Sequence, residues 1–281
     1  MPTYAYRLVN VFTRPGIALS GNPLCVFEGG QGLDTATMQA LALQFNLSET
    51  TFILPAQHGA SARVRIFTPT FEMPFAGHPT LGTAHVCRAL GMGGDRLTLE
   101  MTAGIITVRS SGSRWTLLAR APHYRELTEP PFVLASLLGV EKEDIGERPL
   151  WVDTGSEQLL VPLRSEAAVR RVRVRADLLE QLRNRDGQAM VYVFASAGGA
   201  LLARFFFPHG ASVSEDPATG SAAANLGGWY LATGRSLPCE VEIAQGEYTG
   251  RGSSLRLQVD AARQIHVSGE VVDIGRGSIH L

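Results

Sequence analysis

The sequence predicts an α+β protein made of two similar lobes from an internal duplication, each a barrel-like, mostly antiparallel sheet wrapped around a central apolar helix. Three observations lead to this prediction. One pattern, x-Pro-x-x-Gly-Ser/Thr-Ala, occurs at residues 78–84 and again at 216–222. A segment with few or no charged residues follows each copy, and helices that are apolar all round are buried. Stretches of alternating polar and apolar residues, typical of half-buried strands, occur in both halves.

The first half of the chain begins with strands that surround a helix. The helix can be capped by Asp34 and ends near Asn46. Its apolar side chains fall at i, i+3, i+4 and i+7, which places one stripe against a core: Met38, Leu41, Ala42 and Phe45. Four stretches read as strands: residues 6–12, 22–27, 50–54 and 62–68.

The second half repeats this order. Residues 189–194 and 202–208 read as strands, and Pro208 precedes the second copy of the pattern as Pro69 precedes the first. The distances from these prolines to the prolines of the pattern are nearly equal, 217 − 208 = 9 and 79 − 69 = 10. This agreement supports a duplication.

A linker is expected near the middle of the chain. Prolines gather and the periodicity lapses at residues 121–131. The sequence therefore predicts an N-terminal lobe over residues 1–124 and a C-terminal lobe over residues 125–281, whose final strand can pack on the N-terminal lobe.

The two copies of the pattern begin with different residues, His78 and Asp216, which are 216 − 78 = 138 positions apart. A polar residue directly before proline suits a helix N-cap followed by proline at the first helical position. We therefore expect His78 and Asp216 at equivalent helix starts, one in each lobe. Chemistry is expected where two otherwise similar lobes differ.

Composition limits the possible partners. The chain has 281 residues with 25 basic and 26 acidic side chains, a net charge of −1 that favours neither nucleic acid nor a membrane surface. A small molecule is the expected partner. Three cysteines without metal-type spacing indicate neither a disulfide framework nor a metal site, and a cytoplasmic location is expected: Cys25, Cys87 and Cys239.

Glu49 is the first candidate for acid–base chemistry. It lies where the predicted helix meets the next strand, a place from which a side chain can point out of a rigid scaffold into a cleft. Burial beside apolar walls would raise the pKa of such a carboxyl group and suit it to act as a general base near neutral pH. The alternative is a solvated glutamate at the start of a strand.

His78 and Asp216 are the next candidates. Either side chain can be a structural cap, or it can face a ligand. The N–H groups at a helix start attract anions, so Gly77, Gly220 and Ser221 are candidate ligands of a substrate carboxylate.

With these residues the sequence resembles the phenazine-biosynthesis isomerase family, relatives of diaminopimelate epimerase, along nearly the whole chain. The matching motifs occur in the order found in the family: Gly21-Asn22-Pro23, Ser48-Glu49-Thr50, Phe67-Thr68-Pro69, Glu72-Met73-Pro74-Phe75-Ala76-Gly77-His78-Pro79-Thr80 and Glu215-Asp216-Pro217-Ala218-Thr219-Gly220-Ser221-Ala222.

The resemblance implies a two-lobed diaminopimelate epimerase-like fold, an active site between the lobes, no cofactor or metal, and a homodimer. It implies that Glu49 moves a proton between ring carbons of a substrate such as trans-2,3-dihydro-3-hydroxyanthranilate, giving a ketone. The residues His78 and Asp216 would assist, while Ser48 and Asn22 would bind the substrate.

The chain departs from the two-base epimerases of this fold, which carry a cysteine at the motif of each lobe. Neither motif here contains one, and all three cysteines are expected to be buried and inert. Carboxylate-based isomerisation is the main hypothesis. Epimerisation of an amino or hydroxy acid by Glu49 with His78 or Asp216, and ligand binding without catalysis, stay open as alternatives.

Overall fold

The chain forms two compact units, which are described separately. The computed structural model describes residues 1–281, apart from the side chain of Ala197. The first unit comprises Met1–Leu118 and Ser268–Leu281, and the second unit comprises Ala119–Val267. The boundary expected from the sequence, at residue 124, lies shortly after Leu118.

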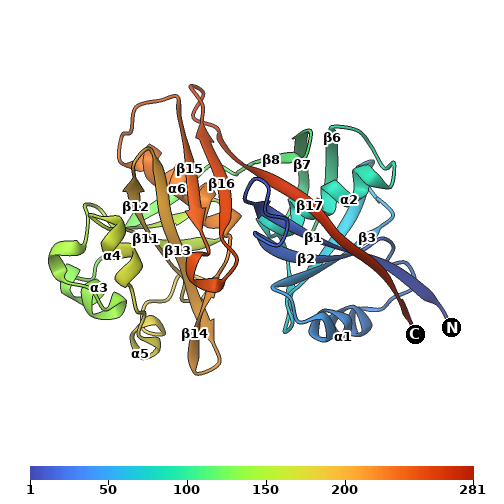
Figure 1. Ribbon diagram of the computed structural model, residues 1–281, viewed down its shortest axis with the longest axis horizontal. Coiled ribbons are helices and arrows are strands. Elements are labelled where there is room, and N and C mark those ends of the chain that lie inside the picture. The colour runs from blue at the N-terminus through green and yellow to red at the C-terminus, as the bar shows by residue number, and fades with distance from the viewer. The chain divides into compact units, whose positions relative to one another are not determined.

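The sheet of the first unit closes into a barrel (Figure 1). Its strands are β1 (Thr3–Thr13), β2 (Asn22–Phe27), β3 (Glu49–Leu54), β4 (Ala62–Phe67), β5 (Glu72–Met73), β6 (Arg96–Met101), β7 (Gly104–Ser111), β8 (Arg114–Leu118) and β17 (Ile265–His280). Neighbouring strands pair in the order β1, β2, β3, β4, β6, β7 and β8. Because β17 pairs with both β8 and β1, the ring of strands is complete. The predicted barrel-like sheet is confirmed.

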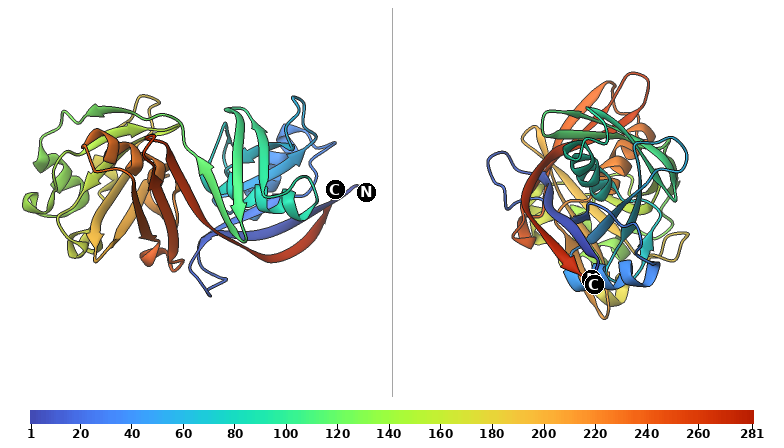
Figure 2. Two further views of the ribbon diagram at one scale, coloured as in Figure 1. Left: turned by 90° about the horizontal axis from the view of Figure 1, so that it is seen from above. Right: turned by 90° about the vertical axis from the view of Figure 1, so that its right-hand side faces the viewer.

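The last strand brings the two ends of the chain together. β17 runs antiparallel to β1, with His280 opposite Thr3 and Glu270 opposite Thr13. The backbone N–H of Leu281 donates a 3.1 Å hydrogen bond to the carbonyl of Pro2. The termini therefore lie side by side in every view (Figures 1 and 2).

Helix α1 (Thr35–Phe45) lies outside this barrel and matches its prediction. The Asp34 carboxylate accepts a 2.7 Å hydrogen bond from the N–H of Thr37, and Asn46 ends the helix with a left-handed backbone conformation. The apolar stripe packs on strand side chains to form a buried cluster: Cys25, Phe27, Met38, Leu41, Ala42, Phe52, Leu54 and Phe67.

Helix α2 (Gly77–Ala89) is the central helix of the barrel, where it packs against β1, β2, β3 and β8 (Figure 2). Every residue from Gly77 to Ala84 is buried. A helix can be enclosed in this way only if it carries almost no charge, which is what the sequence shows. The predicted buried helix is confirmed.

The second unit is built from a corresponding set of strands, together with more helices. Its strands are β9 (His123–Glu126), β10 (Leu150–Asp153), β11 (Glu157–Pro162), β12 (Val191–Ala197), β13 (Ala200–His209), β14 (Ser212–Asp216), β15 (Cys239–Gln245) and β16 (Ser253–Val259). Its helices are α3 (Pro131–Leu138), α4 (Glu166–Arg171), α5 (Ala176–Leu179) and α6 (Gly220–Ala232), with 3-10 turns η1 (Lys142–Asp144) and η2 (Glu247–Thr249). Helix α6 is the counterpart of α2 and is buried in the same way.

The strand pairings of the two units match and support the predicted duplication. In the first unit β2 is parallel to β3, β3 is antiparallel to β4, and β4 is parallel to β6. In the second unit β11 is parallel to β12, β12 is antiparallel to β13, and β13 is parallel to β15. The hairpin strands β5 and β14 pair with β4 and β13.

The structure nevertheless changes the register of the repeat. The central helices each have 13 residues and begin at Gly77 and Gly220, which are 220 − 77 = 143 positions apart. His78 therefore corresponds to Ser221, and the expected equivalence of His78 with Asp216 is wrong. The repeated pattern that follows the structure is Glu-x-Pro-x-x-Gly, at residues 72–77 and 215–220.

The prediction that His78 and Asp216 are N-caps is also wrong. The caps are Ala76 and Thr219, and neither side chain makes a capping hydrogen bond. His78 is the second residue of α2, whereas Asp216 is the last residue of β14. The first N–H groups of a helix have no partner within it, so Pro79 fits at the third helical position as well as at the first. The proline alone did not mark the helix start.

Candidate active site

In the first unit, Glu49 and His78 lie together. Glu49 is the first residue of β3, at the helix-to-strand junction that the sequence indicated, and its side chain is 15% exposed. The His78 side chain, on the first turn of α2, is 7% exposed. Its Nε2 atom lies 3.1 Å from Oε2 of Glu49. Two of the three predicted acid–base residues thus form a close, largely buried pair.

Two chain segments bring this pair together. β2 runs parallel to β3, and Leu24 stands opposite Glu49 in the register. The carbonyl oxygen of Pro23, the residue before Leu24, accepts a hydrogen bond from the His78 ring. The start of the central helix is therefore tied to the edge of the sheet where Glu49 lies.

Burial favours the neutral form of the His78 ring. Burial lowers the pKa of His78 to about 3, and the hydrogen bond to the Pro23 carbonyl only partly opposes this effect. A carbonyl oxygen only accepts, so the ring nitrogen that faces it carries the proton. Nε2 has no hydrogen bond of regular geometry, and in the neutral ring it presents a lone pair toward Glu49 at 3.1 Å.

Three predicted substrate-binding residues adjoin this pair in the chain. Asn22 is fully buried as the first residue of β2, where it stands opposite Val11. Gly77 is buried as the first residue of α2, and Ser48 is exposed directly before β3. Asn22, Gly77 and Ser48 therefore directly precede Pro23, His78 and Glu49 in the chain.

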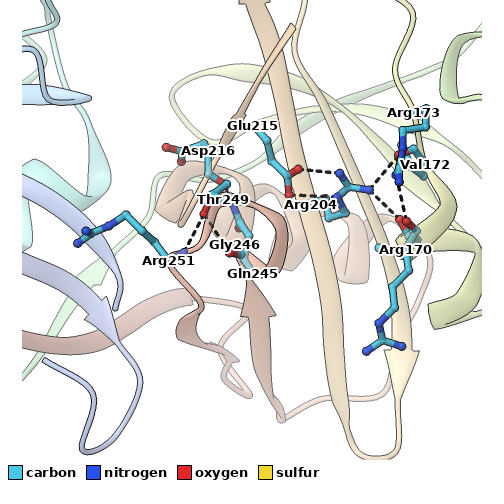
Figure 3. Close-up of polar contacts among 11 residues, drawn as sticks. Arg170, Val172, Arg173, Arg204, Glu215, Asp216, Gln245, Gly246, Thr249 and Arg251 are labelled. Atoms are coloured by element: carbon cyan, nitrogen blue, oxygen red, sulfur yellow. Dashed lines mark hydrogen bonds and ion pairs between the residues drawn. The ribbon is translucent and has the colours of Figure 1, made fainter. Parts of the chain in front are cut away.

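Asp216 lies in the second unit, at the end of β14, where Thr219 and Gln245 hold it. Its Oδ2 atom accepts a 2.5 Å hydrogen bond from the hydroxyl of Thr219. Its carbonyl oxygen accepts a 2.9 Å hydrogen bond from the side-chain amide of Gln245, which is drawn beside it in Figure 3. Sequence reasoning missed both partners.

Gly220 and Ser221 begin helix α6 in the same unit. Gly220 is buried, and the Ser221 hydroxyl oxygen accepts a 2.9 Å hydrogen bond from Nε2 of Gln158. The Oε1 atom of Gln158 in turn accepts a 2.9 Å hydrogen bond from the amide of Asn225, one helical turn further on. Ser221 is therefore oriented by a buried polar network that could not be predicted from local sequence patterns.

A bidentate arginine–glutamate pair precedes each central helix. Arg65 donates from Nε and Nη2 to Glu72 at 2.7 and 2.5 Å. Arg204 donates in the same way to Glu215 at 3.0 and 2.7 Å, and Figure 3 shows Asp216 directly after this pair. These pairs were also missed, although the repeated Glu-x-Pro-x-x-Gly pattern is the signal that could have found them.

The cysteines lie apart from both motifs. Burial raises the pKa of Cys25 well above its ordinary value and that of Cys87 to about 12, so both are inert as expected. Cys239, at the start of β15, is only partly buried, so its expected burial is wrong.

Among the described residues, no three His, Cys, Asp or Glu side chains are arranged to hold a metal ion. None of their helices combines the length and the hydropathy that crossing a membrane requires.

Comparison with known proteins identifies the class. The profile of the phenazine biosynthesis-like protein family matches residues 9–277. An uncharacterized isomerase of Pasteurella multocida is 37% identical over 278 residues, which cover 98% of this chain and 94% of the relative. The trans-2,3-dihydro-3-hydroxyanthranilate isomerase of Pseudomonas fluorescens is 35% identical over 297 residues, 98% of this chain and 99% of the relative.

A solved structure agrees on the fold. The crystal structure of a Bacillus anthracis phenazine biosynthesis protein of the PhzF family superposes with a TM-score of 0.85, covering 100% of both chains at 23% identity. The protein is thus an isomerase with an α+β, strand-dominated barrel fold. It belongs to the phenazine biosynthesis-like protein family.

Proposed function

We propose that this isomerase moves a proton within a small carboxylated substrate such as trans-2,3-dihydro-3-hydroxyanthranilate, without a cofactor. The 3.1 Å contact between Glu49 and a buried, neutral His78 carries this proposal. A carboxylate next to a lone pair is a suitable arrangement for taking up a proton and giving it back. The relative from Pseudomonas fluorescens, named for this substrate, supports the choice.

In the proposed reaction, Glu49 is both base and acid. Its carboxylate takes a proton from one ring carbon, and the electron pair of the broken C–H bond shifts into the conjugated system. The carboxylic acid then returns the proton to another ring carbon, and the resulting enol gives the ketone. While Glu49 carries the proton, Nε2 of His78 can accept a hydrogen bond from it and so fix the orientation of the acid.

The remaining predicted residues are proposed to hold the substrate. Backbone N–H groups at Gly77 and Gly220 suit a carboxylate, because helix starts carry donors without partners inside the helix. We assign hydrogen bonds with substrate to a second set: Ser48, Asn22, Asp216 and Ser221.

The test is the isomerisation of dihydrohydroxyanthranilate in D₂O, followed by NMR. The wild-type protein is expected to give the ketone with deuterium at the carbon that receives the proton. Glu49→Gln should lower the rate roughly 10²- to 10⁴-fold, the usual contribution of a general acid–base group. The exposed Glu126→Gln is the matched control and should keep the rate.

Two results would contradict the proposal. Undiminished activity of Glu49→Gln would remove Glu49 from the reaction. Inversion at a single carbon, with deuterium at that stereocentre, would identify the protein as an epimerase that uses Glu49 with His78 or Asp216.

We also propose a cytoplasmic homodimer, as the family resemblance implies. The net charge of −1 gives no general attraction to nucleic acid or anionic membranes. A monomer mass in sedimentation equilibrium at micromolar concentration would contradict the dimer.

A further inference from the structure

Gln245 uses its whole side-chain amide to hold one segment. This residue ends β15 and is only 2% exposed. Nε2 donates to the carbonyl of Asp216 and to Oγ1 of Thr219, both at 2.9 Å, and Oε1 accepts from the N–H of Thr219 at 3.3 Å. A carbonyl must accept and a backbone N–H must donate, so these contacts fix which amide atom is nitrogen.

This orientation also fixes the hydroxyl proton of Thr219. The Gln245 amide nitrogen can only donate, so Oγ1 of Thr219 is the acceptor of that bond. The single hydroxyl proton is then directed to Oδ2 of Asp216, 2.5 Å away. Hydrogen bonds that end on a carboxylate are about twice as strong as neutral ones. The chain of donors runs in one direction, from Gln245 through Thr219 to Asp216.

The first unit supplies an independent comparison. Arg65 and Arg204 make the corresponding ion pairs with β5 and β14. In the parallel pairings, Leu99 of β6 stands opposite the residue three positions before Arg65. Ile243 of β15 stands opposite the residue three positions before Arg204, so Leu99 and Ile243 are equivalent. Two residues later, Met101 therefore occupies the position of Gln245.

The other two members of the donor chain are replaced in the same way. The residue after the ion-paired glutamate is Met73 in the first unit and Asp216 in the second. The residue before the central helix is Ala76 in the first unit and Thr219 in the second. Three equivalent positions are all apolar in one unit and all polar in the other, so the polar residues form a set.

We propose that Gln245 and Thr219 are positioning residues that fix the carboxylate of Asp216, and that this arrangement serves the isomerase reaction. The second part rests on the proposed function, in which Asp216 contacts substrate. Neither Gln245 nor Thr219 is assigned a contact with the reacting atoms.

The first experiment needs no substrate. The Thr219 hydroxyl proton, which is buried and bonded to a carboxylate, should exchange slowly and resonate downfield in the NMR spectrum of the wild-type protein. Its resonance should move upfield in Asp216→Asn, where the acceptor is neutral, and should also shift in Gln245→Met, where the donor to Oγ1 is lost. Gln181→Met, at an exposed glutamine, is the matched control and should leave it in place. If the resonance is absent, or if its chemical shift is unchanged in both variants, the proposed donor chain is wrong.

The second experiment measures kcat and KM with dihydrohydroxyanthranilate. Thr219→Val keeps the shape of the side chain but removes the hydroxyl, and kcat/KM should fall roughly 10- to 100-fold, the effect of one hydrogen bond to a charged group. Thr219→Ser restores the hydroxyl and should recover most of this loss. A purely structural role would lower activity by the same factor in any background.

The decisive comparison is therefore the Thr219→Val change in an Asp216→Asn background. If Thr219 acts through Asp216, the further loss should be less than about threefold, because most of the coupling is already gone. An equal loss in both backgrounds would overturn the positioning role. If the wild-type protein does not act on this substrate, the proposed function fails, while the hydroxyl resonance still decides whether the donor chain exists.

Discussion

The two units share a frame and differ in the side chains placed on it. Each has an arginine–glutamate pair before a 13-residue buried helix that begins with glycine. At the second position of that helix the first unit carries His78, next to Glu49, and the second unit carries Ser221, next to Gln158. The two units thus carry side chains of different chemistry at the same position of equivalent helices. The difference shows that function has to be sought in the positions that diverged.

The shared pair itself has a different environment in the two units. The Arg65 and Glu72 side chains are 21% and 30% exposed, whereas those of Arg204 and Glu215 are 6% and 12% exposed. Arg204 also donates to the Val172 carbonyl at 3.0 Å, as drawn in Figure 3, and its guanidinium lies 4.3 Å from the centre of the Tyr248 ring. The Arg204–Glu215 ion pair of the second unit is therefore buried, whereas the Arg65–Glu72 ion pair of the first unit is partly exposed to solvent.

The largest expected effect follows from this burial. Glu215→Gln keeps the side-chain shape but leaves the Arg204 charge buried without its partner, which costs roughly 3–5 kcal/mol of unfolding free energy. Glu72→Gln, at the more exposed pair, should cost about 1 kcal/mol or less. Urea unfolding followed by circular dichroism measures both values. Equal losses would show that burial does not separate the two pairs.

A double variant checks the cause of that loss. Arg204→Met with Glu215→Leu removes both charges, and it should be closer to the wild-type stability than Glu215→Gln alone. A double variant as unstable as the single one would point to lost packing in place of the stranded charge.

The middle of the central helix offers a second comparison. Gly82 of α2 and Asn225 of α6 are equivalent, because they are 225 − 82 = 143 positions apart, the same distance as the two helix starts. At Gly82 an added Cβ would lie 2.6 Å from the Leu24 side chain. Asn225 instead accepts from the N–H of Thr154 at 2.8 Å and donates to the Ser156 carbonyl at 2.9 Å. One helix approaches its sheet closely, and the other is held to it by hydrogen bonds.

Asn225→Ala should therefore destabilise the protein by roughly 2–3 kcal/mol, because the buried Thr154 N–H loses its acceptor. Gly82→Ala should cost roughly 1–3 kcal/mol through overpacking against Leu24. The two differ in their effect on Ser221, whose partner Gln158 is bonded to Asn225. Only Asn225→Ala should also raise KM for the proposed substrate. A raised KM in both variants would mean that helix position, not the polar network, controls the site.

These comparisons show which features could be predicted from sequence. The Asp34 cap, the nearly uncharged central helices and the place of Glu49 at a strand start all follow from local patterns, and the structure has them. The register of the repeat does not. The glutamate follows its arginine by 7 residues in the first unit and by 11 in the second, because the second hairpin is longer. That difference hides the arginine–glutamate pairing from any count of fixed spacing, although the Glu-x-Pro-x-x-Gly pattern itself keeps its spacing in both units.

The partners of Asp216 were beyond sequence reasoning for another reason. Gln245 lies 26 positions after Thr219, on a strand that reaches it only through the parallel pairing of β13 and β15. A glutamine at the end of a strand gives no local signal of such a contact. Candidate residues could be found from motifs, whereas the side chains that orient them depend on the folded sheet.

A pH-dependent effect is expected at the His78 position, where the second unit has Ser221. The pKa of His78 is lowered to about 3 in the folded protein, against about 6.5 in an unfolded chain, so the unfolded state binds more protons between these values. The contribution of His78 to stability is thus complete above pH 6.5 and is lost as pH falls toward 3, by up to about 1.4 kcal/mol per pH unit. Urea unfolding of the wild-type protein and of His78→Gln from pH 7.5 to 4.5 should show a steeper fall in stability in the wild type.

His123→Gln, at an exposed histidine of β9, is the matched control and should keep the wild-type slope. The opposite sign would be equally informative, since stability that rises as pH falls from 7.5 would require an imidazolium at His78. In that case Nε2 would carry a proton and donate it to Glu49 across the 3.1 Å contact. The carboxylate would then be held as an ion pair, and Glu49 would have to break that pair before taking a proton from substrate. The sign of the slope therefore decides between a lone pair and a proton at the position where the two units differ most.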